Sequence, residues 1–144
     1  YAFRPYVRSK GAKIGLIFLV LAGVGEAMAA VFDINHSLHD LAGNIGIGCL
    51  PVAAVLISRS LGYGKLLAHA TWASVLLLAI SFAVLMSTYV SSGGDLDAGV
   101  SITTLPDGVV ALVGWTNRLL VIVYTAWVAA TAWYLASSRL SRSK

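Results

Sequence analysis

The segment FDINHSLHDLAGNIGIG, residues 32–48, holds most of the side chains of this chain that could do chemistry. It carries two aspartates, Asp33 and Asp40, and two of the three histidines, His36 and His39. Oxygen and nitrogen ligands this close together suggest a metal ion, because a hydrolytic zinc site needs three protein ligands and one open position. Such spacings also arise easily in a short polar loop. A metal-assisted hydrolase using these four residues is therefore an alternative and not the leading interpretation.

A haem between two helices requires a histidine on each helix at the same depth. His36 and His39 precede the second apolar run, and His69 lies at the start of the third. Because successive spans run in opposite directions, His69 is expected at the other side of the membrane. The three histidines therefore form no matched pair within the chain. We predict no cofactor, with bound lipid as an option, and a redox or pigment-associated subunit remains an alternative.

Glu26 is the costliest side chain in the sequence, because it interrupts a long apolar run. A charged carboxylate at membrane depth costs on the order of 3 kcal/mol or more, so we expect it to be buried in a bundle, protonated or paired. Asp33 lies two helical turns further on, and Asp40 and Asn44 share a face at i, i+4. Together with Arg118, which enters the last apolar run from the same side, these residues form a candidate polar cluster.

Three interpretations of this cluster stay open. In the first, Arg118 pairs with Asp33 or Asp40, and the other side chains cap helices or form hydrogen bonds between them. Asp40 fits this interpretation because an acidic residue near a helix N-terminus is stabilised by the helix dipole. In the second, the cluster lines a pocket for a lipid headgroup or small solute. In the third, it is a catalytic or proton-relay site.

The composition places these residues in an integral membrane protein. The chain has 144 residues, of which 58% are hydrophobic and 11% charged, and its mean hydropathy is +0.84, whereas soluble domains have about 25% charged residues. Four apolar runs, at about 14–32, 41–58, 66–90 and 112–136, are each long enough to cross about 30 Å of hydrocarbon as a helix. Backbone groups in lipid must be satisfied internally, so we predict an all-α, four-span transmembrane bundle in a single domain, 1–144.

The basic residues predict the orientation of this bundle. They precede the first run, separate the second from the third and follow the fourth: Arg4, Arg8, Lys10, Lys13, Arg59, Lys65, Arg139, Arg142 and Lys144. The aspartates lie at the other end. By the positive-inside bias, both termini are expected in the cytoplasm. The net charge of +4 then reflects topology and contact with anionic lipid, and not nucleic-acid binding.

Small residues mark the expected packing surfaces of the second run. Gly43, Gly46 and Gly48 allow close approach of another helix. Pro51 follows them, and we expect it to kink the helix and to leave a carbonyl that needs a partner. Trp127, in the middle of the last run, is expected to be a packing anchor, and Cys49 a buried small hydrophobe.

Three segments together resemble a known family. They are GAKIGLIFLVLAGVGEAMAAVFDINHSLHDLAGNIG, PVAAVLISRSL and GWTNRLLVIVYTAWVAATAWYL. They are similar to the prokaryotic membrane family named domain of unknown function 998, over about residues 11–140. The resemblance implies a six-helix protein of which these are the last four helices, with two more preceding Tyr1. The resemblance implies that Asp33, His39 and Arg118 are site residues. Glu26 is not part of the family pattern, and the family has no established activity.

The sequence thus predicts a multi-pass protein of a prokaryotic plasma membrane. Its leading function is a non-enzymatic one, as a lipid-binding protein or an accessory or structural subunit of a membrane complex. The expected partners are membrane lipids and other membrane subunits or the missing N-terminal helices. The ligand candidates are Glu26, Asp33, His39, Asp40, Asn44 and Arg118.

Overall fold

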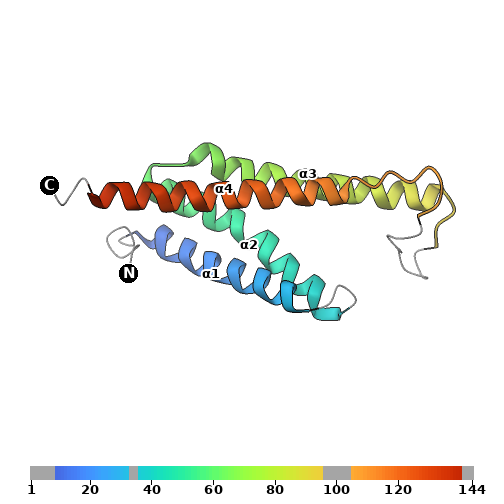
Figure 1. Ribbon diagram of the computed structural model, residues 1–144, viewed down its shortest axis with the longest axis horizontal. Helices are drawn as coiled ribbons and strands as arrows, with labels where there is room; N and C mark the ends of the chain where they lie inside the picture. Colours follow the sequence, from blue (N-terminus) through green and yellow to red (C-terminus); the bar gives the residue numbers. More distant parts are fainter. Residues whose placement is uncertain (1–8, 33–35, 96–104, 141–144) are drawn as a thin grey trace.

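Four helices make up the fold (Figure 1). The computed structural model describes residues 9–32, 36–95 and 105–140. The helices are α1 (Lys10–Val31), α2 (Ser37–Leu61), α3 (Lys65–Ser91) and α4 (Val113–Leu140), and the described residues contain no strand. All four are long and apolar enough to cross a membrane. The all-α class and the four spans predicted from the sequence are confirmed.

Helices α1 and α2 begin before their predicted apolar runs because a polar side chain caps each of them. The Ser9 hydroxyl accepts a hydrogen bond from the Ala12 N–H and starts α1 at Lys10. The His36 ring accepts from the Leu38 N–H and starts α2 four residues before the predicted position 41. Such caps satisfy backbone donors that a helix leaves unpaired in its first turn.

A three-residue turn joins α2 to α3. Gly62 and Gly64 have φ values of +67° and +73° there, a left-handed conformation that costs glycine little and other residues more. The ring of Tyr63, between them, stacks on Tyr134 of α4 with a centroid distance of 4.3 Å. We call the end of the molecule that carries this turn the turn end.

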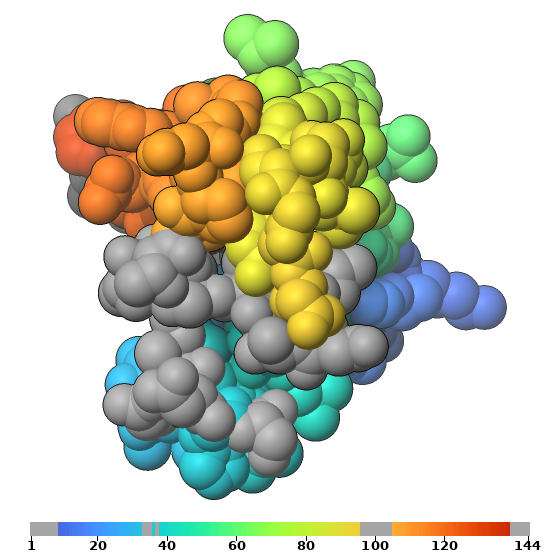
Figure 2. Space-filling view, turned by 90° about the vertical axis from the view of Figure 1, so that its right-hand side faces the viewer, coloured from blue at the N-terminus to red at the C-terminus, as the bar shows by residue number. Residues whose placement is uncertain are grey.

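The helices form two hairpins, α1–α2 and α3–α4, which contact each other over only part of their length. Helix α1 packs against α2 alone, while α3 packs against α4 and against α2. Figure 1 shows the α1–α2 hairpin diverging from α3 and α4 with distance from the turn end. In the end-on view of Figure 2, the ends of α3 and α4 lie above those of α1 and α2.

The shared core lies toward the turn end, where α2 meets α3 and α4. Its members are small or medium side chains with two aromatic residues: Ala22, Leu50, Ala53, Ala54, Ile57, Ala68, Leu120, Tyr124 and Trp127. Trp127 is only 1% exposed, which confirms its predicted role as a packing anchor. Cys49 is half-buried against this core, so it is less enclosed than predicted.

Glycine permits the closest approach of α1 and α2. A Cβ on Gly25 would lie 2.6 Å from the Gly46 nitrogen and 2.7 Å from the Ala42 carbonyl oxygen. Backbone therefore lies directly against backbone at this crossing, as small residues allow in membrane helices. This confirms the predicted packing role of Gly46, whereas Gly43 and Gly48 have open space beside them.

Candidate functional site

Glu26 lies one residue from this crossing, at the edge of the α1–α2 interface. A Cβ added to Gly46 would lie 2.6 Å from Glu26 Oε1, so the carboxylate rests on the bare backbone of α2. None of the four helices covers the side chain of Glu26, however, and it is exposed. The expectation that Glu26 is buried within the bundle is thus wrong for these helices, because α1 has no second helix packed on it.

Two further exposed residues of α1 share a face with Glu26. Gly23 precedes it by three positions and Ala30 follows it by four, which places all three on one side of the helix. Both are exposed, and a Cβ on Gly23 would meet no atom within 4 Å. We call Gly23, Glu26 and Ala30 the Glu26 face. It combines one carboxylate with small residues that let another backbone approach closely.

Tyr124 of α4 links the two hairpins near this face. Its hydroxyl donates a hydrogen bond of 2.6 Å to the Ile47 carbonyl of α2. Proline has no N–H, so Pro51 cannot donate to the carbonyl four residues before it, which is that of Ile47. The predicted need of this carbonyl for a partner is confirmed, and the partner is Tyr124. Glu26 is close enough to Tyr124 to interact with it electrostatically.

A second hydrogen bond joins α4 to α2 one turn closer to the turn end. The Trp127 indole Nε1–H donates to the Ser58 hydroxyl at 3.0 Å, and both side chains are 1% exposed. Tyr124 and Trp127 lie three residues apart and so share one face of α4. Two polar contacts from this face therefore hold α4 to α2.

Arg118 lies on α4 away from the other predicted cluster members. Its Cζ is 5.3 Å from the ring centroid of Trp115, within the range of a cation–π contact. Within the described ranges Arg118 forms no ion pair with Asp40, because the two hairpins diverge toward this end. Pairing with Asp33 stays a prediction, since Asp33 lies outside the described residues.

The two histidines near the start of α2 have local structural partners. His36 stacks on Phe32 at 4.8 Å and caps α2, and His39 Nδ1 forms a 3.0 Å hydrogen bond with the Phe32 carbonyl. The described part of the chain contains no group of three residues placed to hold a metal ion. Asp33 lies outside that part, so the four-residue metal site stays an untested alternative.

Asp40 and Asn44 lie on a different side of α2 from Glu26. Asp40 is in the first turn of α2, as predicted, and both side chains are exposed. Glu26 contacts α2 at Gly46, and residues two apart on a helix do not face each other, so Asn44 points elsewhere. Of the predicted cluster members that the structure describes, Glu26 is the one that lies beside Gly46.

Tyr124 and Ser58 are polar partners that the sequence did not predict. The signal for Tyr124 was indirect, because Pro51 indicated an orphan carbonyl without indicating its donor. Nothing in the sequence distinguishes Ser58 from the other serines of the spans, and only its contact with Trp127 in the folded chain identifies it.

Comparisons of the chain with protein families, with curated proteins and with solved structures gave no match. The resemblance to domain of unknown function 998 therefore stays a prediction.

Proposed function

We propose that this multi-pass membrane protein is a non-enzymatic accessory or structural subunit of a larger membrane complex. In this proposal, a transmembrane helix of that complex packs on the Glu26 face. We place the protein in a prokaryotic plasma membrane with both termini cytoplasmic, as the distribution of basic residues and the family resemblance favour.

One observation carries this proposal: Glu26 is exposed at membrane depth. No hydrogen bond or ion pair reaches its carboxylate from the residues that the structure describes. Ionisable side chains within membrane spans face a protein interior or a water-filled space and have partners, because lipid does not solvate them. A donor from outside these four helices would complete the surroundings of Glu26.

The residues around Glu26 favour a helix over a lipid chain as the occupant. Gly23 and Ala30 present almost no side chain, and small residues let two helix backbones come close in a membrane. A lipid tail offers no donor to a carboxylate. A helix can bring a polar side chain to Glu26 while its backbone packs on the small residues.

Co-purification from native membranes tests this function. The tagged wild-type chain, extracted in a gentle detergent, should retain a stoichiometric membrane protein, and Glu26→Leu should lose it. Asp40→Asn is the matched control, since it removes an exposed carboxylate from the other hairpin helix and should retain the partner. Equal retention in both variants, or bound lipid without any protein partner, would contradict the proposal.

A further inference from the structure

A cavity of about 250 Å³ lies between α2 and α3 at the turn end. Each helix contributes residues at i, i+3 and i+4, which form one face. The lining is Val55, Ser58, Arg59, Lys65, Ala68 and His69. The cavity is separate from the Glu26 face, and its role does not depend on the proposed partner helix.

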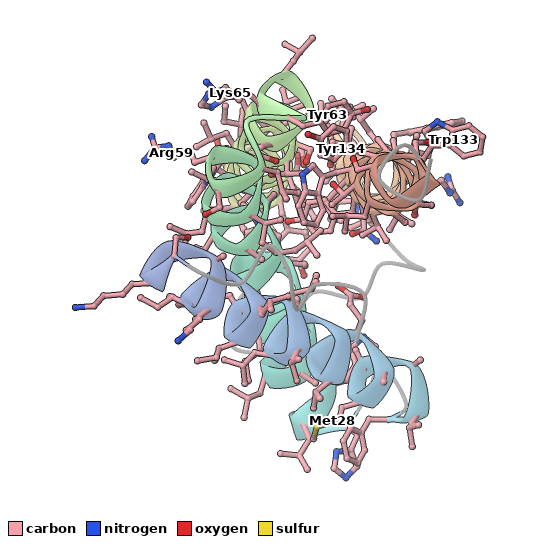
Figure 3. The ribbon with its side chains drawn as sticks, turned by 90° about the vertical axis from the view of Figure 1, so that its left-hand side faces the viewer. Met28, Arg59, Tyr63, Lys65, Trp133 and Tyr134 are labelled. Carbon is pink, nitrogen blue, oxygen red and sulfur yellow. The ribbon has the colours of Figure 1, made fainter. Side chains whose placement is uncertain are left out.

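Positive charge dominates the rim of this cavity. Arg59 and Lys65 are exposed, and Figure 3 shows them extending to the same side of the α2–α3 turn. None of the lining residues is acidic. Two cations that line one cavity without an acidic neighbour in its lining repel each other, and an anion placed between them removes this repulsion.

A buried hydroxyl group adds a hydrogen-bond donor to the wall. Ser58 is 1% exposed, and its oxygen accepts the indole N–H of Trp127. A serine hydroxyl can donate one bond while it accepts another, so its proton remains available to a ligand. Guanidinium, ammonium and hydroxyl donors around one small space are the groups that bind phosphate oxygens.

An aromatic contact holds the turn between Arg59 and Lys65 in place from the side opposite to these two residues. Tyr63, between Arg59 and Lys65 in the chain, stacks on Tyr134, and the interplanar angle is 7°. In Figure 3 this stacked pair lies on the side of the turn opposite to Arg59 and Lys65. The stacking therefore fixes the turn between the two helix ends that carry Arg59 and Lys65.

The surroundings of the cavity favour a lipid as the source of the phosphate. Trp72 follows His69 by one helical turn and is 43% exposed, and tryptophan is enriched where membrane meets water. Leu76 continues the same face of α3 and is 60% exposed. The volume is below the roughly 300–1,000 Å³ of pockets that enclose a drug-sized ligand, so a headgroup fits inside while its acyl chains lie along α3.

We propose that this cavity binds the phosphate of an anionic phospholipid headgroup. Arg59 and Lys65 bind the phosphate oxygens, Ser58 donates from the wall, and His69 closes the rim. The preference for an anionic over a zwitterionic lipid follows from the two cations, because the choline group of phosphatidylcholine brings a positive charge to the same place.

Lipid binding to the whole purified chain in detergent tests this site by native mass spectrometry. The probes are phosphatidylglycerol and phosphatidylcholine with identical acyl chains. We expect the wild-type chain to prefer phosphatidylglycerol. Each lost basic contact should weaken that preference about fivefold, so Arg59→Gln with Lys65→Gln should weaken it about 25-fold.

The matched control is the double variant Lys10→Gln with Lys13→Gln. It removes the same charge from exposed positions at the same end of the molecule, outside the cavity. It should leave the preference within about twofold of wild type, and Lys65→Arg should retain it, since both keep the cavity cations. An equal loss in the two double variants would overturn the proposal in favour of general surface charge.

Competition by inorganic phosphate distinguishes a lipid headgroup from free phosphate as the ligand of this cavity. If the ligand is a lipid, millimolar phosphate should leave most of the bound phosphatidylglycerol in place. Complete displacement by inorganic phosphate, or equal binding of the two lipids by the wild-type chain, would overturn the assignment. Circular dichroism of every variant excludes loss of the helices as the cause of a weaker preference.

Discussion

The Tyr124 hydroxyl donates to the Ile47 carbonyl at 2.6 Å, across 77 positions of the chain. Ile47 precedes Pro51 by four residues, so its carbonyl has no helical N–H to accept. Tyr124 of one hairpin therefore supplies the donor that Pro51 removes in the other. This hydrogen bond joins the two hairpins near the point from which they diverge.

Tyr124→Phe should destabilise the fold by about 1 kcal/mol, a typical value for a hydrogen bond between membrane helices. The substitution keeps the ring in the core and leaves the Ile47 carbonyl without a donor. Reversible unfolding in detergent micelles, followed by the helical circular dichroism signal, measures this loss.

Pro51→Ala should make Tyr124→Phe less costly. Alanine restores an N–H four residues after Ile47, so the carbonyl regains a helical partner. A double-mutant cycle should then give a coupling energy of about 0.5 kcal/mol or more between the two positions. Additive effects would show that the tyrosine hydroxyl does not replace the missing amide.

Gly25→Ala should weaken the α1–α2 hairpin by about 1–3 kcal/mol, because overpacking has a cost of that size. The added methyl would meet the backbone of Gly46 and Ala42 at 2.6 and 2.7 Å, and backbone atoms have little freedom to move. Gly23→Ala is the control, since a Cβ there meets nothing within 4 Å. Similar losses in both variants would contradict the close crossing.

Opposite ends of the helices should react on opposite sides of the membrane. In a Cys49→Ser background, Lys10→Cys and Asp107→Cys each place one thiol at an exposed position. A membrane-impermeant maleimide added to intact cells should label position 107 and should label position 10 only after permeabilisation. The reverse pattern would contradict the cytoplasmic placement of the termini that we propose.

The number and type of elements were predictable because each span is a continuous apolar run. Length and hydropathy alone indicate a helix in lipid, where the backbone has no other partner. Pro51 was equally informative, since a missing N–H always leaves an identifiable carbonyl. Both predictions depend on properties of the residues themselves, hydropathy in one case and a missing N–H in the other, which can be read from the sequence.

The arrangement of the helices was not predictable in the same way. Helix α1 is apolar on all sides, so its hydropathy does not indicate which face packs on α2, although its glycines at 15 and 25 do lie against α2. The expected burial of Glu26 assumed that four helices surround it, whereas α1 contacts one. Likewise, Asp40 and Arg118 lie near the starts of α2 and α4, two helices that belong to different hairpins and diverge toward these starts (Figure 1).

The most direct test of the account is photo-crosslinking from α1 in native membranes. A photoreactive residue replaces Gly23, on the Glu26 face, or Val24, its neighbour at the same depth on another side of α1. We predict a discrete protein adduct from position 23 and lipid adducts alone from position 24. Lipid adducts alone from both positions would contradict the proposal that a helix of a larger complex covers Glu26.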